Sequence, residues 1–414
     1  MKYADARAAE RRRGAVLAET EEFASIEKRG RMDLPFLLLV LILLSIGVVM
    51  VLSASYASAY YEYGNPTRYF TRQLAFAVLG AAGMILVARF TNMTFVRRFS
   101  MMALMISIGL LVLVLFVGSV RNGARRWFDI EITTIQPSEI AKMGIILAFS
   151  VMMCKYGDAL RKLKKSTMRR FIWAFVPFAL VLGIVVILLA LEPHKSAALI
   201  IVAIAAVVMF AGGLDIRLCF AAIVVALIAA VIIVGMAESS YATIVETGGG
   251  DYAFRRIVFW LHPEAEPTRG GYQVLQSLYA IGSGGLTGLG LGQSRQKYLY
   301  LPEEHNDYIF AIVCEELGYI GALLILALFA LLIIRGFWIA MHARGRFEAL
   351  VATGITGMLA IQVFLNISVV TNLLPCTGIS LPFFSYGGSA LLMQLAEMGI
   401  ILAISRDMPI TKAG

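Results

Sequence analysis

Long hydrophobic runs separated by short polar segments make up most of this 414-residue chain. An α-helix needs about 20 apolar residues to cross a bilayer, whereas buried strands of soluble proteins are apolar runs of only about 4–8 residues. The pattern therefore predicts an all-α polytopic membrane protein with ten transmembrane helices. The predicted spans are 34–55, 70–88, 100–118, 136–153, 171–191, 196–213, 218–236, 307–334, 350–371 and 385–404.

The first hydrophobic run follows a charged leader of 33 residues and continues from Leu34 to about Leu52. This run is longer than the apolar part of a signal peptide, which is about 7–15 residues. Ala57-Ser58-Ala59 resembles a cleavage site. The length of the run favours a retained membrane anchor.

Composition agrees with a membrane protein, because 59% of the residues are hydrophobic and only 15% are charged. The net charge of +9 is better explained by membrane topology than by nucleic acid, since most Lys and Arg lie between the hydrophobic runs. Four scattered cysteines form no CxxC pair, so we predict neither a disulfide framework nor a zinc site.

The distribution of Lys and Arg orients the predicted spans. The segments between the spans alternate between the two sides of the membrane. The side that includes both ends of the chain holds 24 of these 36 residues, and the other side holds 10. Basic residues favour the cytoplasmic side, so both termini are predicted to be cytoplasmic. The predicted parts are a charged tail (1–33), a membrane domain (34–407) with a long extracellular loop between spans 7 and 8 (237–306), and a C-terminal tail (408–414).

Two outer segments carry arginines against this rule, namely 119–135 and 237–306. In the first, Arg126 and Trp127 precede Glu139 and Lys142, which are i,i+3 neighbours on one predicted helix face. One interpretation is a structural Glu–Lys pair, and the other is the wall of a polar cavity. Arginines beside an aromatic ring also suit a lipid phosphate.

The segment Glu192-Pro-His-Lys-Ser196 is a short polar connection between two spans. A role in lining a cavity is one interpretation. A tight interhelical turn explains its proline and charges equally well, and we favour the turn.

The polar end of the longest non-hydrophobic segment begins at Gly282, where a glycine-rich segment leads to Leu301-Pro-Glu-Glu-His-Asn-Asp307. Without a βαβ context the glycines do not indicate a nucleotide loop; they favour close backbone packing or a re-entrant segment. Asp307 suits a helix N-cap, an acid/base carboxylate or a divalent-cation ligand. Glu315 and Glu316 are expected to pair with polar groups of other spans.

The segment Leu381-Pro-Phe-Phe-Ser-Tyr-Gly-Gly-Ser389 enters the last predicted span. Ser385 suits a helix cap, or the segment exposes backbone amides to an anion. The polar residues Gln362, Asn366, Gln394 and Glu397 are expected to form hydrogen bonds between helices.

Several of these stretches together resemble the SEDS family of FtsW, RodA and SpoVE. They occur in family order and spread over roughly residues 30–407. Gln293–Glu303 and Val369–Pro375 resemble the division/sporulation branch (FtsW and SpoVE) more than the elongation branch. The matching pieces are Asn122-Gly-Ala-Arg-Arg-Trp, Gln136-Pro-Ser-Glu-x-x-Lys, Gly271-Tyr-Gln-x-x-Gln-Ser, Leu301-Pro-Glu-x-His-x-Asp-x-Ile-Phe, Glu315-Glu-Leu-Gly and Leu381-Pro-Phe-x-Ser-Tyr-Gly-Gly-Ser.

One short segment and two single residues depart from the family pattern. Family members often have Gln-Pro-Asp-x-Gly where this chain has Glu192-Pro-His-Lys-Ser196, and Asn306 and Tyr308 stand where Thr and Phe are common.

The resemblance implies a peptidoglycan glycosyltransferase that polymerises lipid II outside the membrane and releases undecaprenyl diphosphate. It identifies Asp307 as the catalytic aspartate and Trp127, Glu139 and Lys142 as cavity residues. From their charge, Arg126, Arg256 or Lys142 would stabilise the diphosphate. The full set of predicted substrate-binding residues is Arg126, Trp127, Glu139, Lys142, Arg256, His305 and Ser385.

The resemblance also implies a class B penicillin-binding protein and other division proteins as partners in the plasma membrane of a bacterium. The division septum is the expected place, while a role in cell division and a role in sporulation both stay open. Lipid II and membrane lipids are further expected contacts, and nucleic acid is not. A divalent cation, Mg²⁺ or Mn²⁺ on Asp307, is an open expectation, whereas no nucleotide or organic cofactor is expected. The alternatives are a flippase for lipid-linked precursors and a non-catalytic division scaffold.

Overall fold

The computed structural model describes residues 30, 32–121, 124–130, 133–161, 168–242, 244, 252–265 and 271–408. The tail 1–33 lies outside these residues except for three of its last four, as do the predicted turn at Asn122-Gly123 and all but the first residue of 408–414.

Within the described residues, nine helices are long and apolar enough to cross a membrane. The tenth predicted span corresponds to the shorter α7 (Lys195–Ala211, 17 residues), so its crossing stays a prediction. The nine are α2 (Leu34–Tyr63), α3 (Arg68–Phe90), α4 (Met93–Val117), α5 (Pro137–Leu160), α6 (Met168–Leu191), α8 (Ile216–Ser239), α12 (Ile309–Met341), α13 (Arg346–Val370) and α14 (Gly388–Arg406).

The observed ends of the helices agree better with the positions of capping residues than with the limits of the hydrophobic runs. Asp33 accepts the backbone N–H of Phe36 (2.9 Å) at the start of α2, and Pro137 occupies the first turn of α5 as predicted. At its other end α2 runs eight residues beyond the predicted span and stops at the left-handed Gly64. Polar side chains at a bilayer surface do not end a helix, so the hydrophobic run underestimated its length.

The predicted all-α class needs a correction, because 119–135 contains a small sheet. Strands β1 (Ser119–Arg121), β2 (Ala124–Ile130) and β3 (Thr133–Ile135) form a three-stranded antiparallel sheet in the order β1-β2-β3. Its aromatic and β-branched residues favour strands, but the strands are too short to stand out beside the hydrophobic helices.

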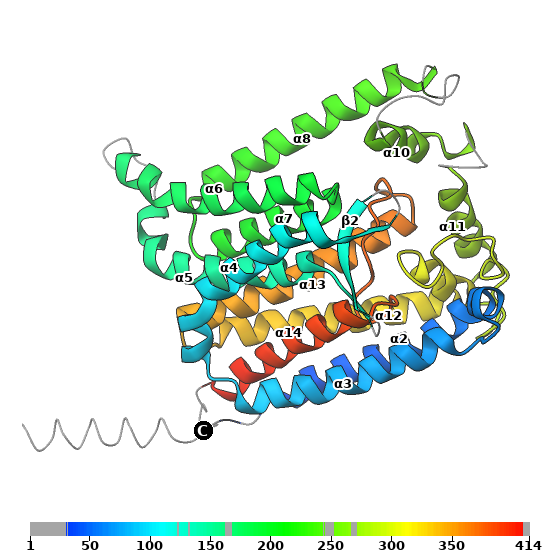
Figure 1. Cartoon of the computed structure of the whole chain (residues 1–414), viewed down its shortest axis with the longest axis horizontal. Helices are drawn as coiled ribbons and strands as arrows, with labels where there is room; N and C mark the ends of the chain where they lie inside the picture. Colours follow the sequence, from blue (N-terminus) through cyan, green and yellow to red (C-terminus); the bar gives the residue numbers. More distant parts are fainter. Residues whose placement is uncertain are drawn as a thin grey trace, which may run out of the picture.

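The most enclosed long helices are α5, α13 and α14, with 72%, 67% and 61% of their most apolar windows buried. The other long helices are less enclosed, and α8 is the extreme case with 0% buried. Figure 1 shows α8 along the upper edge of the molecule, beyond α6 and α7. The long segment 237–306 contains α10 (Tyr252–Leu261), a short 3-10 turn (Pro263–Ala265) and α11 (Tyr272–Ser283).

Hydrogen bonds gather four helix ends at one end of the bundle. Arg335 of α12 forms an ion pair with Asp33 at the start of α2 (2.6 Å), and the backbone N–H of Asp33 donates to Ser405 of α14. Arg406 donates to the carbonyls of Ala88 and Thr91 at the end of α3. The connections that carry the predicted site lie at the opposite end, near α11 and β2 in Figure 1.

The helix α12 is interrupted at Gly318, whose φ of 67° and ψ of −172° lie outside the helical region. The glycine-rich segment before it packs backbone to backbone against this break. Leu289 and Gly290 donate to the carbonyls of Glu315 and Glu316 (both 3.0 Å), and a Cβ on Gly288 would overlap the carbonyl of Glu316. The prediction of close backbone packing is confirmed.

Candidate active site

Asp307 lies in the connection between α11 and α12, two residues before α12 begins. The residue at the N-cap of α12 is Tyr308, so the interpretation of Asp307 as an N-cap is wrong. Its side chain is half-buried. The carboxylate is therefore screened from bulk water but is not sealed inside the protein.

Two other segments hold the backbone around Asp307. Asn366 of α13 donates to the carbonyl oxygens of both Asp307 (2.8 Å) and Ile379 (2.7 Å). The loop between α13 and α14 also approaches the carboxylate itself, because a Cβ on Gly378 would lie 3.2 Å from Oδ2 of Asp307. The catalytic candidate is thus fixed by contacts far away in sequence.

Charged groups around Asp307 act on it in opposite directions. Desolvation by burial, with a smaller contribution from the Glu303 carboxylate, raises the pKa of Asp307 from 3.8 to about 6, against the opposing influence of Arg256 and His305. Arg256 of α10 also donates to the carbonyl of Cys376 (3.1 Å). The structure therefore brings the predicted residues Arg256 and His305 to Asp307.

His305 is packed in an aromatic cluster. Its ring lies 4.6 Å from that of Tyr69 and 5.9 Å from that of Tyr386, and its Nδ1 lies 3.3 Å from Glu304. The backbone N–H of Tyr386 donates to the carbonyl of His305 (2.9 Å). These contacts fix the imidazole beside the aspartate.

Ser385 is not a helix cap, because α14 begins at Gly388 with Gly387 at the N-cap. Its Oγ instead donates to the carbonyl of Asn306 (2.8 Å) and accepts the N–H of Leu381 (2.7 Å). The prediction of amides exposed to an anion is also wrong at 385–387, where the N–H groups donate to Leu381, His305 and Gln73. Ser385 therefore links the loop before α14 to the segment that carries Asp307.

A second group of predicted residues surrounds the start of α5. Glu139 and Lys142 form an ion pair (2.6 Å), and Lys142 is only 2% exposed. Glu397 of α14 lies within electrostatic reach of both, and Gln136 approaches His194 (3.4 Å). The pair exists as predicted, and it belongs to a larger polar cluster drawn from three segments.

Arg126 joins β2 to the turn between α6 and α7. It donates to the carbonyl of Glu192 (3.2 Å) and to that of Pro193, and it lies 6.0 Å from the ring of Trp127. The side chain of Glu192 is 1% exposed, and among the described residues neither of its carboxylate oxygens has a hydrogen-bond partner. Burial raises the pKa of Glu192 to about 8, which Arg126 only partly opposes, and it lowers that of His194 to about 3.

The same turn links the two groups. Ser196, at the start of α7, donates to the carbonyl of Thr377, and the next residue is the Gly378 that approaches Asp307. Ser389 of α14 donates to Thr134 of β3 (2.6 Å), a further link between the loops. The turn 192–196 is therefore more than the interhelical connection favoured from sequence.

Glu315 and Glu316 brace the connection before Asp307. Glu315 accepts the backbone N–H of Arg295 (2.9 Å), and Glu316 accepts Ser53 of α2 (2.7 Å) and the buried Lys297 (2.9 Å). The expected pairing with another span is confirmed for Glu316. Gln394 departs from its expectation, since it accepts the backbone N–H of Phe383 in a loop rather than bonding to a helix.

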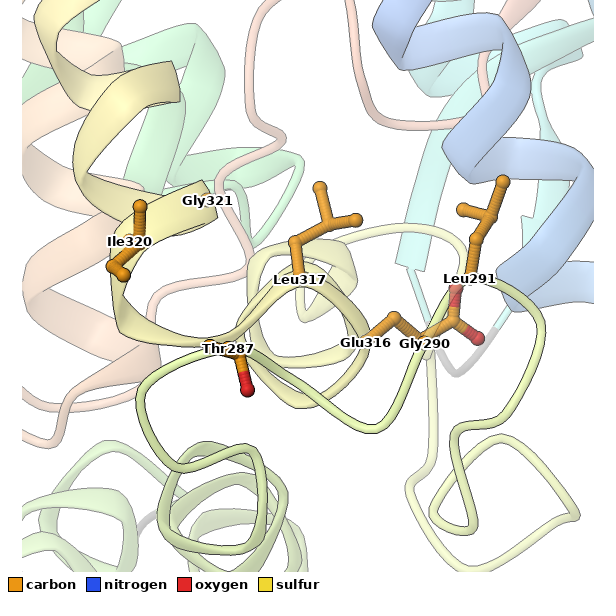
Figure 2. Close-up of a pocket in the computed structure, with 7 residues that line it drawn as sticks. All are labelled: Thr287, Gly290, Leu291, Glu316, Leu317, Ile320 and Gly321. Carbon is orange, nitrogen blue, oxygen red and sulfur yellow. The ribbon is translucent and has the colours of Figure 1, made fainter.

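A pocket of about 390 Å³ lies at the break in α12, and Figure 2 shows the residues that line it. None of the predicted site residues lines it, so it does not add to the candidate active site. Its lining residues are Thr287, Gly290, Leu291, Glu316, Leu317, Ile320 and Gly321.

Two residues of the site were missed in the sequence. Gln73 of α3 is fully buried and forms two hydrogen bonds with the backbone of 385–387, and Tyr69 lies one turn before it on the same helix. The signal that the sequence offered for Gln73 was one glutamine within a hydrophobic run. Such a residue becomes interpretable only when its partners are known.

Comparison with other proteins gives consistent matches over nearly the whole chain. The family model FTSW_RODA_SPOVE, described as "Cell cycle protein", matches residues 34–409. Stage V sporulation protein E of Bacillus subtilis is 39% identical over 382 residues, which cover 92% of this chain and 98% of that protein. A protein of Trichlorobacter lovleyi, named probable peptidoglycan glycosyltransferase FtsW, is 37% identical over 378 residues. These residues cover 91% of this chain and 93% of that protein.

Solved structures share the fold. A chain from the structure described as "Structural coordination of polymerization and crosslinking by a peptidoglycan synthase complex" matches with a TM-score of 0.70 at 29% identity, over 92% of this chain and 99% of that one. The rod shape determining protein RodA of Thermus thermophilus matches with a TM-score of 0.64 at 27% identity, over 92% of this chain and 98% of that one.

Proposed function

The chain belongs to the FtsW/RodA/SpoVE family, and from that membership we infer that it is a peptidoglycan glycosyltransferase. Relatives that match over more than nine-tenths of the chain carry this activity in their names. Its apolar helices are those of an integral membrane protein.

We propose that the enzyme polymerises lipid II into β-1,4-linked glycan strands at the outer face of the membrane and releases undecaprenyl diphosphate. The observation that carries this proposal is the half-buried carboxylate of Asp307, with Arg256 and His305 beside it. Transfer of a sugar to a hydroxyl needs a base for the hydroxyl proton and positive groups for the leaving phosphate.

In the proposed step, Asp307 accepts the proton of the 4-hydroxyl of the acceptor's terminal GlcNAc. The oxygen forms a bond to C1 of the donor MurNAc as the bond from C1 to the lipid diphosphate breaks. An α-linked donor and a β-linked product require inversion, so one displacement suffices and no covalent enzyme intermediate forms. The pKa of about 6 keeps Asp307 mostly ionised at neutral pH.

We assign the leaving diphosphate to the positive groups on either side of the 192–196 turn. Arg126 and Lys142 lie on the side of β2 and α5, and Arg256 lies on the side of Asp307. Fixed positive groups in a site with little water stabilise developing negative charge strongly. Trp127 and Glu139 would shape this side, and His305 and Ser385 the acceptor side.

A divalent cation remains part of the proposal. Within the described ranges no group of three or more His, Cys, Asp or Glu side chains is arranged to hold a metal. Mg²⁺ or Mn²⁺ would therefore be held at Asp307 with oxygen ligands mainly from water and the substrate, and it would neutralise phosphate charge. Chelation with EDTA, followed by return of each ion, tests this part separately.

The cellular setting is also proposed. Both termini would be cytoplasmic and residues 237–306 extracellular, in the bacterial plasma membrane and at the division septum. A class B penicillin-binding protein is the proposed partner, since one structural relative comes from a complex described as coordinating polymerization and crosslinking. Other division proteins and membrane lipids are further proposed contacts.

The decisive experiment replaces Asp307 by Asn, which keeps the size of the side chain and removes the base. We expect polymerisation of purified lipid II in detergent to fall by about 10²- to 10⁴-fold, with unchanged membrane insertion and thermal stability. Glu264→Asn, at an exposed position, is the control. Asp307→Asn protein that still lengthens glycan would sink the assignment.

The same assay separates the alternative functions. Detergent solution has no two sides, so a flippase would make no glycan there, and a scaffold would make none either. Polymer formed by the wild-type chain alone excludes both as its sole activity.

A further inference from the structure

The segment that carries Asp307 is held against the wall of the bundle by two successive layers of hydrogen bonds. The first layer joins it to the loop before α14, where Ser385 Oγ donates to the carbonyl of Asn306 and Tyr386 N–H donates to that of His305. The two bonds fall on the two residues directly before Asp307.

The second layer joins that loop to α3 through one side chain. Nε2 of Gln73 donates to the carbonyl of Ser385, and Oε1 of Gln73 accepts the N–H of Gly387 (both 3.2 Å). A single amide thus bridges the backbone on both sides of Tyr386. Gln73 is fully buried, and a hydrogen bond is electrostatically stronger inside a protein than in water.

Neighbouring residues of α3 extend the same wall. Tyr69 lies one helical turn before Gln73 and places its ring against those of His305 (4.6 Å) and Tyr386 (4.8 Å). A Cβ on Gly388 would overlap the ring of Phe76, so this part of α3 also contacts the start of α14 closely. One face of α3 therefore contacts both loops.

We propose that Gln73 is a positioning residue for the glycosyl transfer: through Ser385 and Gly387 it fixes the backbone of His305 and Asn306, and so sets the place of the Asp307 carboxylate. The inference rests on the proposed role of Asp307. The amide of Gln73 bonds to the backbone of Ser385 and Gly387, so it acts through this loop. Its effect is therefore on the rate of the chemical step, because a displacement of about 1 Å at a reacting group can cost on the order of 100-fold in rate.

The test replaces Gln73 by Met, which has nearly the same shape and removes both hydrogen bonds. We expect kcat for lipid II polymerisation to fall by about 10- to 100-fold while KM changes little, because the substrate contacts remain. Gln73→Glu keeps the acceptor for Gly387 and should recover part of kcat. It is also the variant to use if the Met protein does not accumulate in the membrane.

Gln394→Met provides the matched control. Gln394 is also a buried glutamine and accepts the N–H of Phe383 (3.2 Å) in the same loop, outside the 385–387 stretch that bonds to residues 305 and 306. Both substitutions remove a glutamine that braces the loop, so a general loss of stability would appear in both. Only Gln73→Met should show the large loss of kcat.

Hydrogen–deuterium exchange gives a second measurement that does not depend on activity. In Gln73→Met, backbone amides in 301–308 and 381–388 should exchange faster than in the wild type, and in Gln394→Met those of 301–308 should stay protected. Equal kcat, or equal exchange in 301–308, for Gln73→Met and the wild type overturns the inference while the proposed function stands. Activity retained in Asp307→Asn overturns both.

Discussion

At the scale of the residue, the protonation of Asp307 decides when the proposed reaction runs. A base must be ionised, and the pKa of Asp307 is raised to about 6 by burial and by Glu303. We expect kcat/KM to rise with pH through about 6 and to fall about tenfold per unit below it. The check is a pH–rate profile from pH 4.5 to 7.5, with thermal stability measured at each pH as the control.

Glu303→Gln refines this prediction, because the Glu303 carboxylate disfavours the ionised form of Asp307. Its removal should move the acid limb of the profile to lower pH. An acid limb that moves to higher pH in this variant would contradict the assignment of the limb to Asp307.

Glu192 gives a prediction about stability rather than rate. Its pKa in the folded protein is raised from 4.5 to about 8, so the folded state keeps a proton that the unfolded state gives up above pH 4.5. Stability is therefore lost progressively as pH rises from about 4.5 to 8. Glutamine stays neutral throughout, so Glu192→Gln should raise Tm by roughly 2 °C or more at pH 8 and by less at pH 5.

Thermal unfolding in detergent at the two pH values measures this difference. Glu264→Gln, the same substitution at an exposed position, serves as the control. A gain in Tm for Glu192→Gln that is equal at pH 5 and pH 8 would falsify the account.

At the scale of the element, the sequence predicted helices well and local exceptions poorly. Hydrophobic runs located the nine long helices found in the described part of the chain, and Pro137 marked the start of α5. The three short strands of 119–135 and the exact break in α12 escaped notice, because each depends on a partner segment rather than on its own composition. The same reason explains why Asp307 was found by its motif, whereas Gln73 was not.

The break at Gly318 yields a prediction of its own. Its φ of 67° is unfavourable for any residue with a Cβ, and a Cβ there would overlap the backbone of Gly288. The conformation alone costs an alanine on the order of 1–3 kcal/mol. Gly318→Ala should therefore lower Tm and the yield of folded protein, as measured in detergent.

Gly109→Ala in α4 is the matched control, because a Cβ there meets open space and alanine favours a helix. Equal Tm values for the two variants would show that the contact between Gly318 and Gly288 does not hold the break in place.

At the scale of the whole molecule, the four helix ends joined by Asp33, Arg335 and Arg406 lie opposite the end that carries Asp307. This separation fits a chain whose charge pattern predicts cytoplasmic termini. Tyr300→Cys, at an exposed position in the connection that also carries Asp307, should react with a membrane-impermeant maleimide on intact cells. Arg344→Cys, in the connection between α12 and α13, should react only after the cells are permeabilised.

The wild-type chain gives the background labelling of its native cysteines. Arg344→Cys labelled on intact cells, with Tyr300→Cys protected, would reverse the proposed orientation and place Asp307 away from an extracellular substrate.

The pairing of the glycine segment with the broken part of α12 also constrains how the protein is made. Leu289 and Gly290 find their carbonyl partners on residues 315 and 316, some 26 positions later in the chain. While the ribosome is still producing the residues in between, those amides have no partner from α12. The segment must therefore stay hydrated, or shielded by the insertion machinery, until α12 emerges, and the active-site end of the protein can be completed only late in synthesis.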